Sequence, residues 1–264
     1  MLAIAFLAGT FLSVREAEMR RERFQLVPQT GLWGFLGALL GTKFYHYFQY
    51  PELHESGIWR TFIIWEGGYV FYGGLIGGML GVGIHLRMRR TPLIKSADIA
   101  VPFLCLGQGI VRIGCFLNGC CWGRQTGVPW AVRFPKVSAV YAYMVDQNVI
   151  AEDADKTPAI HPTQLYMMLG LVMIFILLKL ALKHKRFDGE VCLFYCYYYG
   201  ALRFVVETYR GDSARSVLDM TVSQTVSLGL VLFAVLTFGA VKVYARRRVN
   251  AACEEQEDAV EPET

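Results

Sequence analysis

The chain has 264 residues, of which 54% are hydrophobic and 18% are charged, and its mean hydropathy is +0.35. A soluble domain is typically about 45–50% apolar and about 25% charged, so this composition excludes an ordinary soluble domain and predicts a polytopic membrane protein. The net charge of +4 is small. It does not predict a nucleic-acid partner.

Seven apolar segments follow one another along the chain. They cover residues 1–14, 32–50, 69–86, 97–117, 162–182, 191–207 and 222–244. A helix needs about 20 residues to cross a bilayer, and the first segment is short. Because its basic residues follow the apolar run, whereas those of a signal peptide precede it, we interpret it as a helix. The sequence therefore predicts an all-α polytopic integral membrane protein with about seven transmembrane helices.

Basic clusters follow the first, third, fifth and seventh segments. They contain Arg15, Arg20, Arg21 and Arg23; Arg87, Arg89, Arg90 and Lys95; Lys183, Lys185 and Arg186; and Arg246, Arg247 and Arg248. The positive-inside rule places them all in the cytoplasm, so we predict an outer N-terminus and a cytoplasmic C-terminus. Residues 1–248 are predicted to form one transmembrane domain, and the acidic tail 249–264 to be disordered.

The polar segment 119–161 is too long for a plain connector. We predict that it forms a small extramembrane arm on the outer face.

The glycine-rich stretch 107–124 carries Arg112 at the end of an apolar run. A guanidinium in a membrane segment costs about 3 kcal/mol on insertion scales, so Arg112 needs an anionic or polar partner. Arginine binds phosphate with a planar fork of donors, and glycines let the backbone approach a ligand. The stretch is typical of a phospholipid head-group site. The alternative is an ion pair with an acid on a neighbouring helix.

The seven cysteines show no C-x-x-C spacing. We therefore predict no metal site and no cofactor. Cys120 and Cys121 are adjacent, and the sequence leaves open whether they are structural or whether one of them joins a disulfide.

Three further polar motifs lie at predicted helix ends. In the first, 161–166 (HPTQLY), Gln164 and Tyr166 have either a site role or the ordinary role of helix entry and interfacial anchoring. In the second, Glu66–Gly78, glycines explain close helix packing but do not explain Tyr72.

The third motif places Tyr199, Arg203, Glu207 and Arg210 on one helix face, because they step by four, four and three. Glu207 can pair with Arg203 or with Arg210, but it cannot neutralise both. An anionic substrate would supply the missing charge. The alternative is a self-contained ladder of salt bridges.

Together these blocks resemble the prolipoprotein diacylglyceryl transferase family of bacteria. The resemblance rests on 112–124 (RIGCFLNGCCWGR), 72–78 (YGGLIGG), 161–166 and 199–210 (YGALRFVVETYR), which occur in the family's order. It implies seven transmembrane helices in the bacterial cytoplasmic (inner) membrane. It also implies transfer of a diacylglyceryl group from phosphatidylglycerol to the lipobox cysteine of a prolipoprotein signal peptide, with release of glycerol 1-phosphate.

The resemblance also implies roles for individual residues. Arg112 matches the arginine that holds the lipid phosphate, and Arg203 and Tyr199 match positions that function requires. The remaining implied contacts to substrate are Asn118, Gly119, Gly123, Gly73, Gly74, His161, Gln164, Glu207 and Arg210. Tyr199 or Tyr72 is expected to orient the acceptor thiol or to relay its proton.

The sequence departs from the family at three points. Tyr72 stands where many members have a histidine that has been considered a general base. Cys115 and Cys120 occupy positions of a signature asparagine and glutamate. The family's segment before the first helix has no counterpart here. Two alternative functions therefore remain: a non-catalytic homologue that binds phospholipid or lipoprotein precursors, and a lipid transporter.

Overall fold

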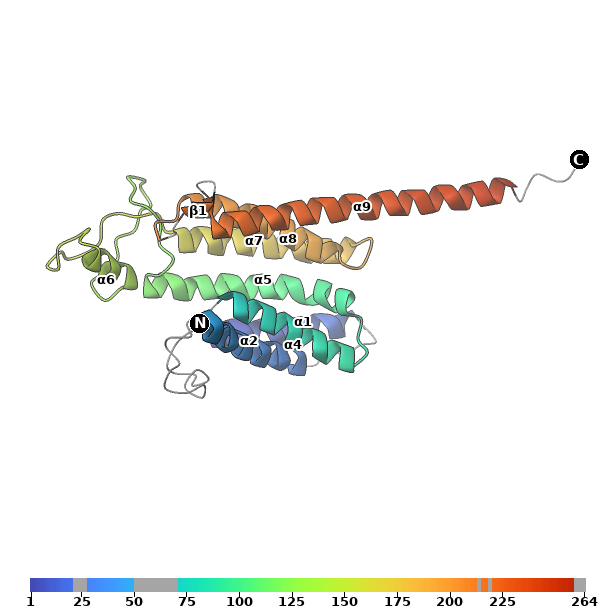
Figure 1. Cartoon of the computed structure of the whole chain (residues 1–264), viewed down its shortest axis with the longest axis horizontal. Coiled ribbons are helices and arrows are strands. Elements are labelled where there is room, and N and C mark those ends of the chain that lie inside the picture. The colour runs from blue at the N-terminus through green and yellow to red at the C-terminus, as the bar shows by residue number, and fades with distance from the viewer. Residues whose placement is uncertain (21–27, 50–70, 213–214, 218–219, 259–264) are drawn as a thin grey trace, which may run out of the picture. The chain divides into compact units, whose positions relative to one another are not determined.

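The computed structural model describes residues 1–20, 28–49, 71–212, 215–217 and 220–258 (Figure 1). The described residues are mostly helical, which confirms the predicted all-α class. The helices are α1 (Leu2–Met19), α2 (Pro28–Gln49), α4 (Phe71–Met88), α5 (Leu93–Asn118), α6 (Ala139–Asp146), α7 (Thr163–His184), α8 (Glu190–Thr208) and α9 (Val222–Asp258). Two short antiparallel strands, β1 (Arg215–Val217) and β2 (Met220–Thr221), pair between α8 and α9.

The predicted apolar segments coincide with long helices. Residue 50 of the second segment and residues 69–70 of the third lie outside the described part of the chain. Among the described residues, three helices are long and apolar enough to cross a membrane: α5, α7 and the part Val222–Tyr244 of α9. Helix α9 continues to Asp258, so the predicted boundary at residue 249 falls inside it. Disorder of the tail stays a prediction.

Helix α7 has a buried side and an exposed apolar side. The buried side chains are Met167, Leu171, Ile174, Leu178 and Leu182. The exposed side chains are Leu169, Met173, Ile176 and Leu180, each more than half exposed. Both sets recur at intervals of three or four residues, as faces of a helix do. An apolar face of this size that is not covered by protein is typical of a helix that contacts lipid.

The described residues form two compact units. In the unit Ala3–Leu104, α2 packs on α4 through glycines. A Cβ on Gly73 or Gly77 would overlap the backbone of Gly41 or Gly37 on α2. These glycines therefore permit close helix packing, and the predicted approach of a lipid to Gly73 and its neighbour at position 74 stays untested. Tyr72 belongs to α4, but its side chain lies outside the described part, as do residues 66–70 of the predicted motif.

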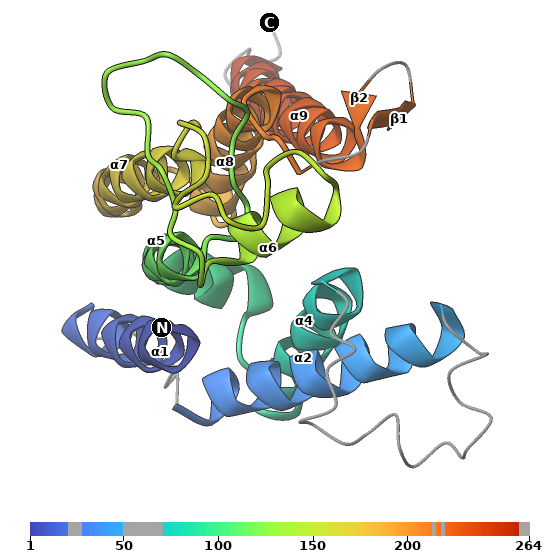
Figure 2. The same cartoon turned by 90° about the vertical axis from the view of Figure 1, so that its left-hand side faces the viewer.

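The second unit comprises Met1–Leu2 and the chain from Cys105 onward. Within it, α7 packs on α8 and α8 packs on α9. The segment 119–161 has its own small core of Phe134, Val140, Met144 and Ile160. Figure 2 shows α6 and the loops of this segment gathered at the end where α5 finishes and α7 begins. The segment is thus folded, and it positions the loop described next. Its place outside the membrane stays a prediction.

Candidate active site

A tight loop follows the last residue of α5. Gly119 has a φ of 73°, and Cys121 has a φ of 59°. Few residues other than glycine adopt this left-handed conformation. The Cys120 amide donates to the Cys115 carbonyl at 3.1 Å, so the chain folds back over the end of the helix. Asn118 is exposed at the last position of α5.

Backbone hydrogen bonds place this loop between two other segments. The Gly123 amide donates to the His161 carbonyl at 3.1 Å, and the Arg124 amide donates to the Tyr209 carbonyl at 2.8 Å. The end of α5, the start of α7 and the end of α8 therefore meet here. A Cβ at Gly123 would overlap His161, so the missing side chain serves this close approach. A substrate contact at Gly123 stays a prediction.

The first two residues of α7 fix the loop by their side chains. The Thr163 hydroxyl donates to the Cys121 carbonyl, and the Gln164 amide donates to the Cys120 carbonyl, both at 2.7 Å. Both α7 side chains are about 1% exposed. The side-chain oxygen of Gln164 is buried and has no hydrogen-bond partner among the described residues. The 161–166 motif therefore has a structural role, because it holds the cysteine loop. The side-chain oxygen of Gln164 could in addition accept a hydrogen bond from a ligand.

His161 and Tyr166 form an aromatic group beside the loop. The His161 Nδ1 lies 3.1 Å from the Tyr166 hydroxyl, which also accepts a hydrogen bond from the indole nitrogen of Trp130 at 2.7 Å. The His161 ring packs against Tyr209, with ring centroids 5.1 Å apart. These contacts hold the imidazole at the end of α8.

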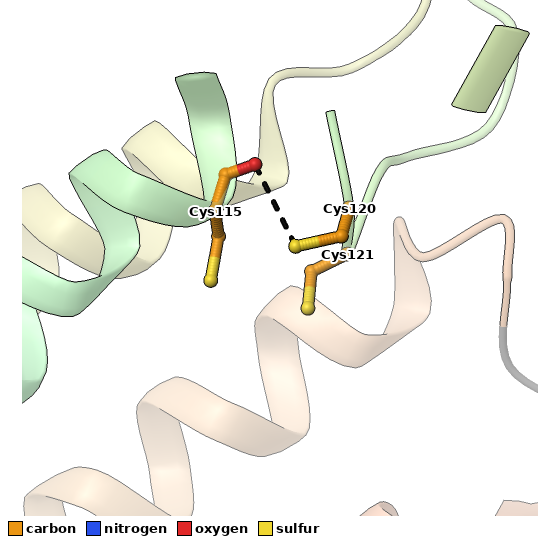
Figure 3. Close-up of side chains that lie close together, drawn as sticks. All are labelled: Cys115, Cys120 and Cys121. Carbon is orange, nitrogen blue, oxygen red and sulfur yellow. Dashed lines mark hydrogen bonds between the residues drawn. The ribbon is translucent and has the colours of Figure 1, made fainter. Parts of the chain in front are cut away.

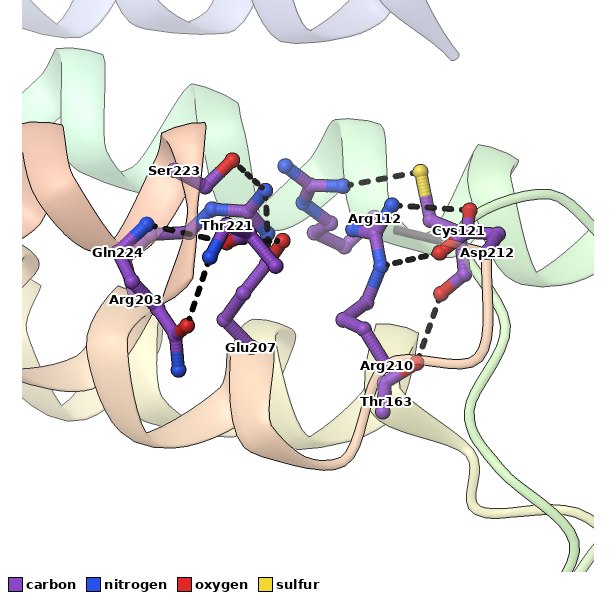
Figure 4. Close-up of polar contacts among 10 residues, drawn as sticks. All are labelled: Arg112, Cys121, Thr163, Arg203, Glu207, Arg210, Asp212, Thr221, Ser223 and Gln224. Carbon is purple, nitrogen blue, oxygen red and sulfur yellow. Dashed lines mark hydrogen bonds and ion pairs between the residues drawn. The ribbon is translucent and has the colours of Figure 1, made fainter. Parts of the chain in front are cut away.

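Helix α8 carries a buried ion pair. Arg203 Nη2 lies 3.0 Å from Glu207 Oε2, and the Glu207 side chain is 1% exposed. Glu207 also accepts a hydrogen bond from Thr221 at 3.1 Å, and Arg203 donates to Ser223 at 2.9 Å (Figure 4). The other terminal nitrogen of Arg203, Nη1, is buried and has no partner among the described residues. Arg203 thus has a donor available for a ligand.

Arg210 has a different partner from the one considered in the sequence. Its guanidinium donates two hydrogen bonds to the Asp212 carboxylate, at 2.6 and 2.9 Å. Glu207 therefore pairs with Arg203, and Asp212 neutralises Arg210. Asp212 follows Arg210 by two residues, so the sequence placed a carboxylate nearby. Both residues lie beyond the end of α8, where spacing alone does not predict whether two side chains meet.

Arg112 has no carboxylate within ion-pair distance among the residues that the structure describes. Its side chain is half-buried, and Nη1 lies 3.5 Å from the Cys121 sulfur. Figure 4 draws its guanidinium together with those of Arg203 and Arg210. Because Glu207 and Asp212 neutralise only two of the three guanidinium groups, the site keeps a surplus positive charge.

Tyr199 lies one turn before Arg203 on α8. Its ring stacks on Tyr195, with centroids 5.3 Å apart and an interplanar angle of 22°. The Tyr195 hydroxyl donates to Gln108 of α5 at 3.0 Å. Since Tyr195, Tyr199, Arg203 and Glu207 recur every four residues, they form one stripe.

Three cysteines that the sequence analysis did not connect also meet at the loop. The sulfur atoms of Cys115, Cys120 and Cys121 lie within 4.8 Å of one another (Figure 3). A hydrogen bond with Cys115 lowers the pKa of the Cys121 thiol, and the charges of Arg210 and Arg112 lower it further against the opposing effect of burial. The thiols were missed because their spacings of five and one match no metal-binding motif.

Apolar helices of membrane-spanning length and a site with surplus guanidinium charge are typical of a membrane protein that binds an anionic ligand. A sequence model of the prolipoprotein diacylglyceryl transferase family matches residues 1–239, and the chain belongs to this family.

Curated relatives agree with this assignment. A phosphatidylglycerol–prolipoprotein diacylglyceryl transferase of Clostridium tetani is 29% identical over 90% of each chain. The proteins of the same name from Pasteurella multocida and Proteus mirabilis are 32% and 30% identical, over 88% and 95% of this chain and 80% and 88% of their own.

Proposed function

We propose that this protein transfers the diacylglyceryl group of phosphatidylglycerol to the lipobox cysteine of a prolipoprotein, which is the first step of lipoprotein maturation. The observation that carries the proposal is the surplus charge at Arg112, which lies in the family's signature block. A lipid phosphate would neutralise this charge. The names and coverage of the relatives support the same reaction.

The phosphate would bind between two arginines. Arg112 offers a guanidinium without a carboxylate partner among the described residues, and Arg203 offers its buried Nη1. Charge-assisted hydrogen bonds of this kind are about twice as strong as neutral ones. Both arginines would also stabilise the charge that develops on the phosphate oxygen as it leaves.

The reaction is a substitution at a glyceryl carbon. The acceptor thiol loses its proton, and the thiolate attacks the carbon that carries the phosphate. A C–S bond forms and the C–O bond breaks, with its electron pair going to the phosphate oxygen of glycerol 1-phosphate. Tyr199 or Tyr72 would orient the thiol or relay its proton. His161, Gln164, Glu207 and Arg210 would shape the head-group site, together with Asn118, Gly119 and Gly123.

The site would lie at the outer face of the bacterial inner membrane. We assign the seven predicted segments to seven spans, with the N-terminus outside, the C-terminus in the cytoplasm and the arm 119–161 outside. The three helices of spanning length and the exposed apolar face of α7 support a membrane location. Residues 1–248 would form one transferase domain, followed by an acidic cytoplasmic tail.

The test is product formation with pure components. Purified protein is mixed with phosphatidylglycerol and a lipobox peptide, and the peptide is analysed by mass spectrometry. We expect the mass of one diacylglyceryl group on the cysteine and no modification of a peptide with alanine at that position. Phospholipid binding without modification would instead identify a non-catalytic homologue.

A further inference from the structure

We propose that Cys115, Cys120 and Cys121 bind one zinc ion through their sulfur atoms, and that the fourth coordination position of this ion receives the acceptor thiol. The first part concerns a metal site at the loop after α5. The second part rests on the proposed transferase function. Zinc would therefore activate the nucleophile in this chain.

The geometry of the three sulfur atoms carries the proposal. They lie within 4.8 Å of one another (Figure 3). Zinc binds thiolate sulfur at about 2.3 Å, which places sulfurs in a tetrahedral site about 3.8 Å apart. An inward movement of roughly half an ångström by each sulfur reaches that spacing, and side-chain rotation alone can supply it.

The loop holds these thiols in place before any metal binds. Cys121 keeps the left-handed conformation, and its carbonyl is fixed by Thr163. Gln164 fixes the carbonyl of Cys120, whose sulfur lies 3.7 Å from the carbonyl oxygen of Cys115. Such outer contacts orient ligands in metal sites and are needed for tight binding.

The surroundings suit a thiolate-bound zinc ion. Zinc with three thiolates carries one negative charge, and Arg112 Nη1, which lies 3.5 Å from the Cys121 sulfur, is placed to donate a hydrogen bond to a zinc-bound thiolate. Hard cations such as Mg²⁺ and Ca²⁺ prefer oxygen ligands. A disulfide between any two of these cysteines would leave the third thiol alone, whereas one zinc ion uses all three.

Three protein ligands with a fourth position open are typical of catalytic zinc sites, whereas structural sites are closed by four. All three cysteines are half-buried, so none of them is sealed in the core. A thiol that binds zinc loses its proton, and here the proton would pass to water. The resulting thiolate would form the C–S bond as the C–O bond to phosphate breaks. This route to the thiolate needs no histidine at the position of Tyr72.

The first experiment measures metal in the whole chain. The protein and its single variants Cys115→Ser, Cys120→Ser and Cys121→Ser are purified under reducing conditions, loaded with Zn²⁺, washed and analysed by elemental mass spectrometry. We expect about one zinc per chain in the parent and in the control Cys196→Ser, and a roughly tenfold lower content in the three variants. Equal zinc content in all five proteins would overturn the site.

The second experiment tests the open position. Co²⁺ replaces zinc, and its absorption spectrum is recorded with a lipobox peptide and with the same peptide carrying serine. We expect the cysteine peptide alone to intensify the thiolate-to-cobalt charge-transfer band. An unchanged spectrum would overturn activation by the metal.

Diacylglyceryl transfer is measured in the same preparations. Transfer by metal-free protein would refute the zinc role and leave the proposed function standing. A cobalt response to the peptide without any transfer would support the metal site and refute the proposed function.

Discussion

Arg203 shows how the site keeps a charged side chain available for a ligand. Glu207 and Ser223 occupy one of its terminal nitrogens, while the other is buried without a partner among the described residues. The Glu207 carboxylate is in turn held by Thr221. One turn of α8 and the start of α9 therefore fix the guanidinium, so that a phosphate meets a donor that is already in position.

We predict that Arg203→Ala lowers both activity and stability. It would leave the Glu207 carboxylate, which is 1% exposed, buried without its cation. Breaking a buried pair in this way costs about 3–5 kcal/mol. The double variant Arg203→Ala/Glu207→Ala should recover most of the free energy of unfolding, because no unpaired charge remains, but it should still lack transfer activity.

Unfolding in detergent micelles measures the change in stability, and product formation measures the change in transfer activity. Equal destabilisation in the single and double variants would show that the pair is not coupled. Recovery of transfer in the double variant would remove Arg203 from phosphate binding.

At the scale of elements, glycines set how closely α2 and α4 pack. A Cβ on Gly77 would overlap the Gly37 carbonyl and would lie 2.8 Å from the Cα of Gly41. The two helix backbones are therefore too close for any side chain at this crossing. Gly83 lies on the same helix α4 with open space at its Cβ position, so it provides a matched control.

We predict that Gly77→Ala destabilises the protein by about 1–3 kcal/mol, because the helices must separate to admit a methyl group. Gly83→Ala should be neutral or stabilising by up to about 1 kcal/mol, since alanine is the better helix former. Thermal unfolding in detergent compares the two. If both variants behave alike, close packing at Gly77 is not what holds these helices together.

Much of the secondary structure could be predicted from the sequence, because a long apolar run has few options other than a helix. Within α8, the spacings predicted that Glu207 pairs with Arg203 or with Arg210, and the structure shows the pair with Arg203. Contacts that depend on folding across the chain could not be predicted. Thr221 of β2 and Ser223 of α9 reach the α8 pair, and Thr163 reaches the cysteine loop from α7.

The cysteine cluster was unpredictable for a related reason. Cys115 lies in the last turn of α5, whereas Cys120 and Cys121 lie beyond a left-handed glycine, and the loop's backbone angles bring their sulfurs together. Because no C-x-x-C pair is present, the cysteine spacing predicted no metal site. A helix end followed by a tight loop can create a three-thiol cluster without such spacing.

At the scale of the whole molecule, the proposed topology follows from the distribution of charge. The basic clusters at the ends of alternate segments predict one cytoplasmic face. The folded segment 119–161 and the site loop would then lie on the outer face, where a lipoprotein precursor emerges. This arrangement would bring the lipid head group and the acceptor thiol to the same side.

Cysteine labelling tests this topology. Val137 is 94% exposed in the arm, and Asp188 is exposed between α7 and α8. In spheroplasts, a membrane-impermeant maleimide should label Val137→Cys directly and Asp188→Cys only after permeabilisation, with the parent protein as background. The reverse pattern would invert the topology and would place the site in the cytoplasm.

The most direct measurement is the release of labelled glycerol phosphate from head-group-labelled phosphatidylglycerol in the presence of a lipobox peptide. The variants are Arg112→Ala and, as a control, Arg133→Ala, which changes an exposed arginine of the arm. Removing one donor to a developing oxyanion typically lowers the rate by about 10²–10³. We therefore predict cysteine-dependent release by the parent and by Arg133→Ala, with a loss of at least this size for Arg112→Ala. Release that does not require the peptide cysteine, or an Arg112→Ala rate equal to that of the parent, would contradict the account.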